Sequence, residues 1–149
     1  MKEPKPVRKT LPHSPPWWVE IEGQVFFVTI CTRPRGKNQL ANGHAWSSIL
    51  GTFLKYQQLG HWHVRRVLAM PDHLHALLSF PAELNMRKRV QSFKSWTAKE
   101  AAISWQDGFF DHRIRADESL EEKSHYIAMN PVRAGLCEKP EDWDYGWKR

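Results

Sequence analysis

Residues 70–80, Met-Pro-Asp-His-Leu-His-Ala-Leu-Leu-Ser-Phe, place two histidines at the head of an apolar run. The run is typical of a buried strand, and Pro71-Asp72 is typical of the turn before it. Side chains two positions apart in a strand point to the same face, so His73 and His75 should project together, about 6.6 Å apart. Two neutral imidazoles held in this way can share one divalent ion from one side. A chance His-x-His is the alternative, because the chain contains eight histidines.

Size and charge limit the class of protein. With 149 residues, of which 41% are hydrophobic, we expect one compact domain with its own core. No apolar run is long enough to cross a bilayer, and no export leader is recognisable. The two cysteines, Cys31 and Cys137, fit neither a disulfide framework nor a zinc ribbon, so we expect reduced thiols in a cytoplasmic protein. The net charge of +6 and the pI near 9.5 favour an anionic partner.

The first segment differs from the rest of the chain. Residues 1–18 carry four basic side chains, one acid and five prolines, a composition that disfavours a helix or a central strand. We expect a flexible basic arm over 1–18 and a folded domain over 19–149, starting near Trp17 and Trp18. The arm is either a solvated tail or a segment that grips nucleic acid.

The order of predicted elements indicates the fold class. Residue patterns predict strands over 24–32, 63–70, 73–80 and 105–115, and helices over 44–59, 85–102 and 117–129. The order β-α-β-β-α-β-α is that of a ferredoxin-like α+β domain, a four-stranded antiparallel sheet with helices on one face. The first and third strands are then central, and the second and third form a hairpin. Gly60 and Pro131 should end the first and last helices, and the segment after 131 shows few signs of regular structure.

Basic residues concentrate on the predicted helix 85–102. Residues 86–99 contain five bases and no acid, and Trp96 lies among them. A helix that is apolar on one side and basic on the other can pack on a sheet and bind phosphates, although an ordinary solvated face is the alternative. Trp96 either stacks on an unpaired base or belongs to the core. The candidate nucleic-acid contacts on this helix, the hairpin and the fourth strand are Arg65, Arg66, Arg87, Lys88, Arg89, Lys94, Trp96, Arg113 and Arg115.

The last predicted helix carries Tyr126 and Asn130, which lie about one turn apart. A tyrosine hydroxyl can attack a phosphodiester that a metal polarises, and it then becomes covalently linked to the cleaved strand. An asparagine oxygen beside two imidazoles leaves positions open for phosphate and suits magnesium or manganese better than a closed zinc site. A core tyrosine and an asparagine that caps a helix end are the alternatives.

Three blocks of sequence, in this order, resemble one family. His73-Leu74-His75 resembles the HUH motif of single-strand DNA nucleases, in which two histidines flank a bulky apolar residue. Residues 126–136, Tyr-Ile-Ala-Met-Asn-Pro-Val-Arg-Ala-Gly-Leu, resemble the tyrosine helix of single-tyrosine transposases, and residues 105–113 resemble the fourth-strand region. The resemblance is most specific to the REP-associated tyrosine transposases and extends from about residue 24 to 147.

The resemblance implies a bacterial, cytoplasmic and nucleoid-associated enzyme that nicks and rejoins single-stranded DNA beside a hairpin, using Mg²⁺ or Mn²⁺. Carried onto this chain, His73, His75 and Asn130 hold the ion, and Tyr126 forms a 5′-phosphotyrosine link. The released 3′-hydroxyl can reverse the attack. The REP-associated branch implies a monomer rather than a homodimer. The alternatives are a hairpin-binding regulator without turnover and, less favoured, an RNA-binding module.

Overall fold

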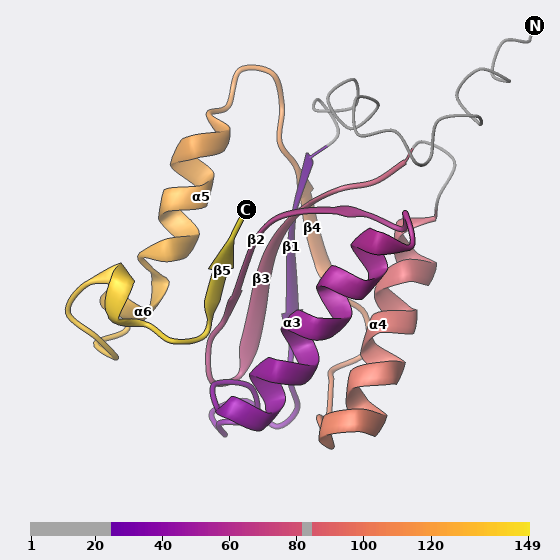
Figure 1. The fold of residues 1–149 in the computed structure, drawn as a ribbon. Coiled ribbons are helices and arrows are strands. Elements are labelled where there is room, and N and C mark those ends of the chain that lie inside the picture. The colour runs from indigo at the N-terminus through magenta and orange to yellow at the C-terminus, as the bar shows by residue number, and fades with distance from the viewer. Residues whose placement is uncertain (1–24, 82–84) are drawn as a thin grey trace, which may run out of the picture.

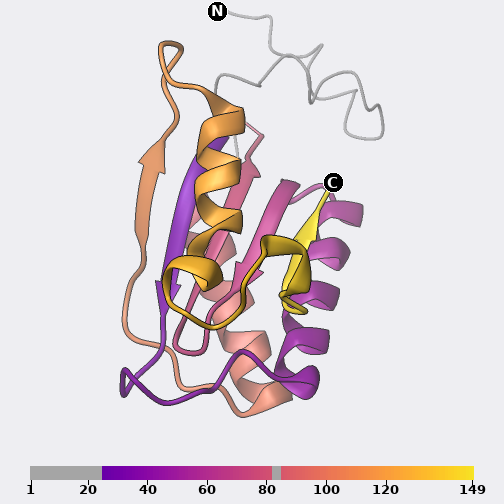
Figure 2. The same cartoon turned by 90° about the vertical axis from the view of Figure 1, so that its left-hand side faces the viewer.

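The computed structural model describes residues 25–81 and 85–149. A five-stranded antiparallel sheet in the order β4-β1-β3-β2-β5 supports the fold (Figures 1 and 2). Its strands are β1 (Val25–Cys31), β2 (His63–Ala69), β3 (His73–Ser79), β4 (Phe110–Arg113) and β5 (Gly146–Lys148). The helices are α3 (Gly43–Gln58), α4 (Met86–Ala101), α5 (Leu120–Ala128), α6 (Asn130–Arg133) and the 3₁₀ helix η2 (Pro140–Asp142). The predicted arm over 1–18 lies outside the described residues.

The first four strands and the two helices between them confirm the ferredoxin-like arrangement. β1 and β3 are neighbours and pair from Val25↔Ser79 to Cys31↔His73. β2 and β3 form the predicted hairpin, with the Met70 N–H donating to the His73 carbonyl at 2.8 Å. The fifth strand was not predicted, because irregular structure was expected for the segment after residue 131. In the structure this segment contains β5, which pairs with β2. Three residues are too few to show the alternation that marks a strand, so the pairing edge decides their conformation.

Different helices cover the two faces of the sheet (Figures 1 and 2). On one face, α3 and α4 form the larger core, where the rings of Phe53 and Phe93 lie 4.6 Å apart and are fully buried. On the opposite face, Ile127 of α5 packs with Leu68 and Leu77. The prediction of helices on one face therefore holds for α3 and α4 but not for α5. Because β1 is apolar on both sides, and Leu77 of β3 adds apolar surface on the α5 side, each face needs a cover.

Local signals set the helix boundaries. The first turns of three helices are capped by side-chain oxygens that accept a backbone N–H, from Asn42 in α3, Asn85 in α4 and Ser119 in α5. Gly60 has a φ of +80° just after α3, which confirms it as a helix stop. Pro131 does not end the helical segment: it lies in the first turn of α6, where a missing N–H is tolerated. No helix in the described part of the chain has the length and apolar character to cross a membrane.

Candidate functional site: a histidine pair beside the α5 helix

His73 and His75 project from β3 toward the face that α5 covers. Their ring centroids lie 4.8 Å apart with an interplanar angle of 75°. Leu74 between them is fully buried in the core on the other face. The two imidazoles thus share a face, as the strand period predicts.

Each imidazole is oriented through its Nδ1 atom. Nδ1 of His73 lies 3.0 Å from Asp72 Oδ1, and Nδ1 of His75 lies 2.9 Å from Thr29 Oγ1. The Asp72 carboxylate can only accept, so it favours the His73 tautomer in which Nδ1 carries the proton and Nε2 keeps its lone pair, and the Thr29 hydroxyl can accept from Nδ1 of His75 in the same tautomer. Metal-binding histidines commonly have such a partner on the second ring nitrogen. The pair therefore fits a metal site that uses both Nε2 atoms.

Asp72 holds the turn that precedes His73. Its carboxylate accepts from Arg35 Nε at 3.0 Å and from the Gly36 N–H at 2.7 Å, and its carbonyl accepts from both the N–H and the hydroxyl of Thr32. Partial burial opposes ionisation, but hydrogen bonds from Arg35, His73 and Gly36 together lower the pKa of Asp72. The side chain is thus an anion at neutral pH, and it fixes the His73 ring.

His75 is a neutral side chain at physiological pH. Burial, followed by the positive charges of His73 and Arg133, lowers the pKa of His75 to about 3. The edge of the Phe27 ring also packs against it, with centroids 5.2 Å apart. The neutral imidazole is the form that can donate a lone pair to a metal.

Tyr126 lies on α5 with 54% of its surface exposed. The guanidinium carbon of Arg133 lies 4.0 Å from the centroid of its ring, and Nη2 of Arg133 donates to the Tyr126 carbonyl at 2.9 Å. Arg133 also acts electrostatically on His75, so it links the tyrosine to the histidine pair. Tyr126 is therefore an exposed side chain on the helix that covers this face of the sheet.

Asn130 is half-buried and opens α6, whereas Tyr126 belongs to α5. The prediction that one regular helix carries both is wrong, because α5 ends at Ala128 and Asn130 begins the separate short helix α6 after Met129. Over residues 25–81 and 85–149, no three or more His, Cys, Asp or Glu side chains form a group able to hold a metal ion.

The predicted nucleic-acid contacts divide between different surfaces. Arg87, Lys88, Arg89 and Trp96 lie on α4, which covers the face opposite the histidine pair. Trp96 is 53% exposed, so it is not a core residue, and it lines a groove between α3 and α4. Arg113 pairs with Phe26 at the sheet edge, and both Arg113 and Arg115 are exposed. Among the described residues, the basic side chains of α4 and those at the β4 edge therefore lie on different surfaces and do not adjoin the histidine pair as one track.

Lys94 is a correction to the predicted DNA contacts. Its side chain is only 5% exposed, and its Nζ donates to the carbonyls of Gln106 and Gly108, both at 2.7 Å. A charge pattern shows which residues are basic but not which way each one points. Lys94 therefore supports the loop before β4 and is not available to a phosphate.

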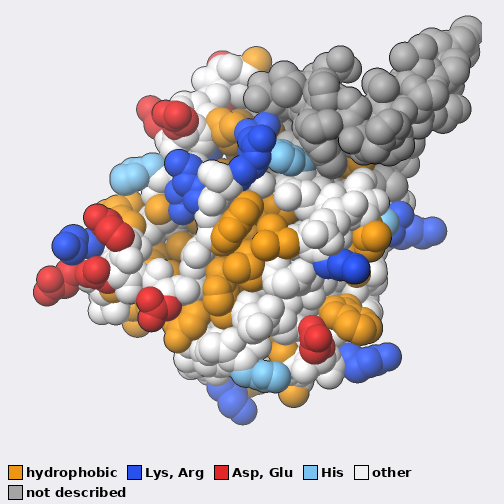
Figure 3. Space-filling view, viewed as in Figure 1, with side chains coloured by type: hydrophobic (Ala, Val, Ile, Leu, Met, Phe, Trp, Pro, Cys, Tyr) orange, Lys and Arg blue, Asp and Glu red, His pale blue; other side chains and the backbone are white. Residues whose placement is uncertain are grey.

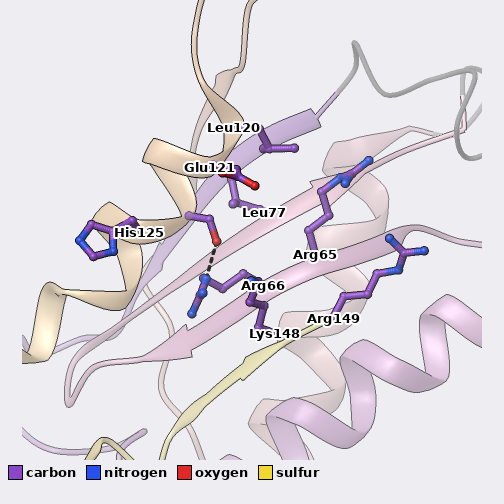
Figure 4. Close-up of a pocket in the computed structure, with 9 residues that line it drawn as sticks. Arg65, Arg66, Leu77, Leu120, Glu121, His125, Lys148 and Arg149 are labelled. Carbon is purple, nitrogen blue, oxygen red and sulfur yellow. Dashed lines mark hydrogen bonds between the residues drawn. The ribbon is translucent and has the colours of Figure 1, made fainter. Parts of the chain in front are cut away.

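Arg65 and Arg66 line a cavity between α5 and the sheet (Figure 4). Its volume is about 400 Å³, and Lys148 and Arg149 also line it. Figure 3 shows Lys and Arg side chains gathered on this side of the molecule, near the C-terminal end.

Sequence reasoning missed Lys148 and Arg149 because β5 was not recognised. It missed Thr29 because this residue is 46 positions from His75 in the chain. The two meet only through the register of β1 with β3.

The comparisons with known proteins agree with this architecture. Residues 26–130 match the family model described as "Transposase IS200 like". An Escherichia coli protein named REP-associated tyrosine transposase is 22% identical over 128 residues, covering 84% of this chain and 76% of the relative. A Haemophilus influenzae protein, provisionally given the same name, is 27% identical over 144 residues, covering 83% of this chain and 79% of the relative.

A solved structure supports the fold independently. A REP-associated tyrosine transposase bound to a REP hairpin superposes with a TM-score of 0.73 at 22% identity, covering 85% of this chain and 77% of that chain. At this identity the likeness establishes the fold. The family model covers the strands β1 to β4, the histidine pair and α5, which carries Tyr126, whereas β5 lies beyond the matched residues. On this evidence the chain belongs to the IS200-like transposase family, and its curated relatives are REP-associated tyrosine transposases.

Proposed function

We propose that this protein nicks and rejoins single-stranded DNA beside a hairpin, with Tyr126 as the nucleophile. The observation that carries the proposal is the pair of adjacent imidazoles, each held through its Nδ1 atom, on the face covered by the helix that bears Tyr126. Membership of a transposase family supports DNA strand transfer. The solved neighbour is bound to a REP hairpin, which supports a hairpin-bearing strand as the substrate.

The proposed transfer is a balanced and reversible exchange of O–P bonds. The Tyr126 hydroxyl attacks the phosphorus, the new O–P bond forms, and the bond from phosphorus to the 3′-oxygen breaks. The phenol proton passes to solvent and the leaving 3′-oxygen takes one up, so a 5′-phosphotyrosine and a 3′-hydroxyl result. Attack by a 3′-hydroxyl on the phosphotyrosine rejoins the strand. Arg133 stacks on the ring and restricts the directions in which the hydroxyl can point.

A divalent ion, Mg²⁺ or Mn²⁺, fits the donor set. His73 and His75 would hold it through Nε2 and Asn130 through its side-chain oxygen, leaving positions for phosphate oxygens. When bound, the ion supplies positive charge that polarises the phosphate. Asp72 and Thr29 keep the two rings in the orientation that such a site requires.

The decisive experiment is the covalent adduct. The protein is incubated with Mn²⁺ or Mg²⁺ and a labelled DNA hairpin with single-stranded flanks, then denatured. We expect a protein–DNA adduct that Tyr126→Phe abolishes while hairpin affinity stays within about twofold of wild type. Tyr56→Phe is the matched control, since this tyrosine lies on α3 at the opposite face, bonded to Ser92. An adduct in the Tyr126→Phe variant would show that the nucleophile is another residue.

A second measurement separates the enzyme from a binding protein. Chelation by EDTA should remove the adduct and leave hairpin binding in place, because the ion serves the chemistry. Tight hairpin binding without an adduct in either ion would instead support a regulator that binds hairpins without turnover.

We also propose that one chain forms a complete site, because Tyr126 and the histidine pair lie on the same side of one sheet. Mixing His73→Ala with Tyr126→Phe tests this. Each variant alone should form no adduct. If each chain uses its own tyrosine, the mixture of the two variants should form no adduct either. An adduct restored by mixing would show that a partner subunit supplies the tyrosine.

A further inference from the structure

We infer that the cavity between α5, β2 and β5 binds one nucleotide of the DNA strand, next to the phosphodiester that is nicked (Figure 4). This inference rests on the proposed function for its substrate and adds a subsite to it. At about 400 Å³ the cavity lies within the size range of small-ligand sites. Leu77 and Leu120 contribute apolar surface, and Arg65, Arg66, Lys148 and Arg149 contribute positive charge.

Cross-strand register places this cavity one row of side chains away from His75. His75 pairs with Leu68 of β2, whereas Leu77, two residues further along β3, pairs with Arg66. Arg66 pairs in turn with Lys148 of β5. Leu77, Arg66 and Lys148 thus form one row across three strands, on the same face as His75. Rows on one face are about 6.6 Å apart, so a nucleotide joined to a phosphate at the histidine pair can reach this row.

The lining chemistry selects a nucleotide over other anions. Among the described residues that line the cavity, Arg66, Lys148 and Arg149 add positive charge beside the carboxylate of Glu121, so the lining favours negative charge. Leu77 and Leu120 belong to the apolar contact between the sheet and α5, and they offer a surface for a base or a sugar. A free inorganic anion would use the charge but not this apolar surface. A nucleotide uses both.

Arg66 gives the cavity a fixed cation. Its Nε donates to Ser124 Oγ of α5 at 2.6 Å, as Figure 4 shows. A guanidinium has five N–H donors, so this bond leaves others for a phosphate. Burial lowers the pKa of Arg66, which accords with a cation partly withdrawn from water. Arg65 and Arg149 line the same cavity from β2 and from the residue after β5, whose N–H donates to the Arg65 carbonyl at 3.1 Å.

An abasic-site scan combined with a cavity-filling variant tests the inference. Each nucleotide of the single-stranded flanks is replaced in turn by an abasic residue, and hairpin affinity is measured by fluorescence anisotropy. We expect one position, beside the nick, at which the abasic residue weakens binding to the wild type about tenfold. Leu120→Trp should fill the cavity and remove the penalty at that position. Leu59→Trp, an exposed position that lines the groove between α3 and α4, is the matched control and should keep the penalty.

A charge variant keeps the inference testable if Leu120→Trp fails to fold. Lys148 and Arg149 are exposed, so Lys148→Gln with Arg149→Gln should fold normally. Each lost phosphate contact lowers the slope of log affinity against log salt by about one, so we expect a fall of up to about two. Lys55→Gln, in the groove between α3 and α4, should leave the slope unchanged.

The outcomes separate this inference from the proposed function. The nucleotide site would be overturned if the abasic residue weakened binding equally in the wild type and in a folded Leu120→Trp variant. An unchanged salt slope in the Lys148→Gln, Arg149→Gln variant would also overturn it. If the same DNA strands still form the covalent adduct, the proposed nicking chemistry stands without the nucleotide site. If the position-specific penalty depends on the cavity but no adduct forms, the site stands and the role of Tyr126 is wrong.

Discussion

Replacing Lys94 by methionine distinguishes a structural lysine from a DNA-binding one. Lys94 lies on α4 within a strongly basic segment, which is why its sequence context suggests phosphate contact. In the structure its ammonium donates to Gln106 and Gly108, in the segment between the isolated bridge of Trp105 with Thr32 and strand β4. Lys94→Met should therefore loosen the segment that leads into β4.

The magnitude follows from the two hydrogen bonds. A hydrogen bond to a charged group contributes about 1.5–3 kcal/mol net, and Lys94 makes two at 2.7 Å. Burial of the ammonium opposes this gain, as its lowered pKa shows. Methionine fills nearly the same volume, so little cavity cost is added. We expect the free energy of unfolding to fall by about 2–4 kcal/mol.

Urea unfolding and salt-dependent DNA binding provide the assay. Lys94→Met should shift the urea midpoint down while the salt slope of hairpin binding stays at the wild-type value. Lys88→Met, at an exposed position of the same helix, should change stability by less than about 0.5 kcal/mol. If Lys94→Met instead keeps the wild-type midpoint and lowers the salt slope by about one, the lysine contacts a phosphate and the structural role is refuted.

Two further predictions concern the surroundings of the site. Thr29→Val removes the hydroxyl that orients His75 and should weaken Mn²⁺-dependent adduct formation about 10–100-fold, measured by titrating Mn²⁺; an unchanged titration would contradict the role of Thr29. The backbone N–H of Arg115, then His112, lowers the pKa of Glu118 from 4.5 to about 2. A carboxylate whose pKa is lower in the folded state stabilises the fold at pH values above its unfolded-state pKa. This stabilisation is lost as the pH falls through the folded-state pKa. Glu118→Gln should thus lower the Tm at pH 7, and the difference from wild type should shrink between pH 4.5 and 2.

Features that depend on short-range periodicity could be predicted from the sequence. The shared face of His73 and His75 follows from the two-residue period of a strand, and the hairpin follows from the Pro71-Asp72 turn. The central position of β1 follows from apolar residues on both of its faces, and that of β3 follows from the ferredoxin-like order of the elements. Each of these depends on residues close together in the chain.

Features that depend on which elements meet in space were not accessible in this way. The α4 segment was correctly read as basic, but packing turned Lys94 inward and left Trp96 exposed, and the charge pattern alone does not separate the two. β5 forms because β2 offers an edge, so Lys148 joins the cavity only after that pairing is known. The role of Thr29 likewise appears only once the register of β1 with β3 is fixed.

The position of Tyr126 depends on tertiary contacts more than on the helix that carries it. α5 has nine residues, a length at which an isolated helix is marginal in water. Its one fully buried side chain is Ile127, next to Tyr126, and Arg66 of β2 holds Ser124 on the preceding part of the helix. Because Arg66 also lines the cavity between α5, β2 and β5, the contact that holds the helix of Tyr126 and the proposed nucleotide site share one guanidinium. A ligand that engages Arg66 would therefore act on a residue that anchors α5, which is a direct physical route from the proposed nucleotide site to the placement of the Tyr126 hydroxyl.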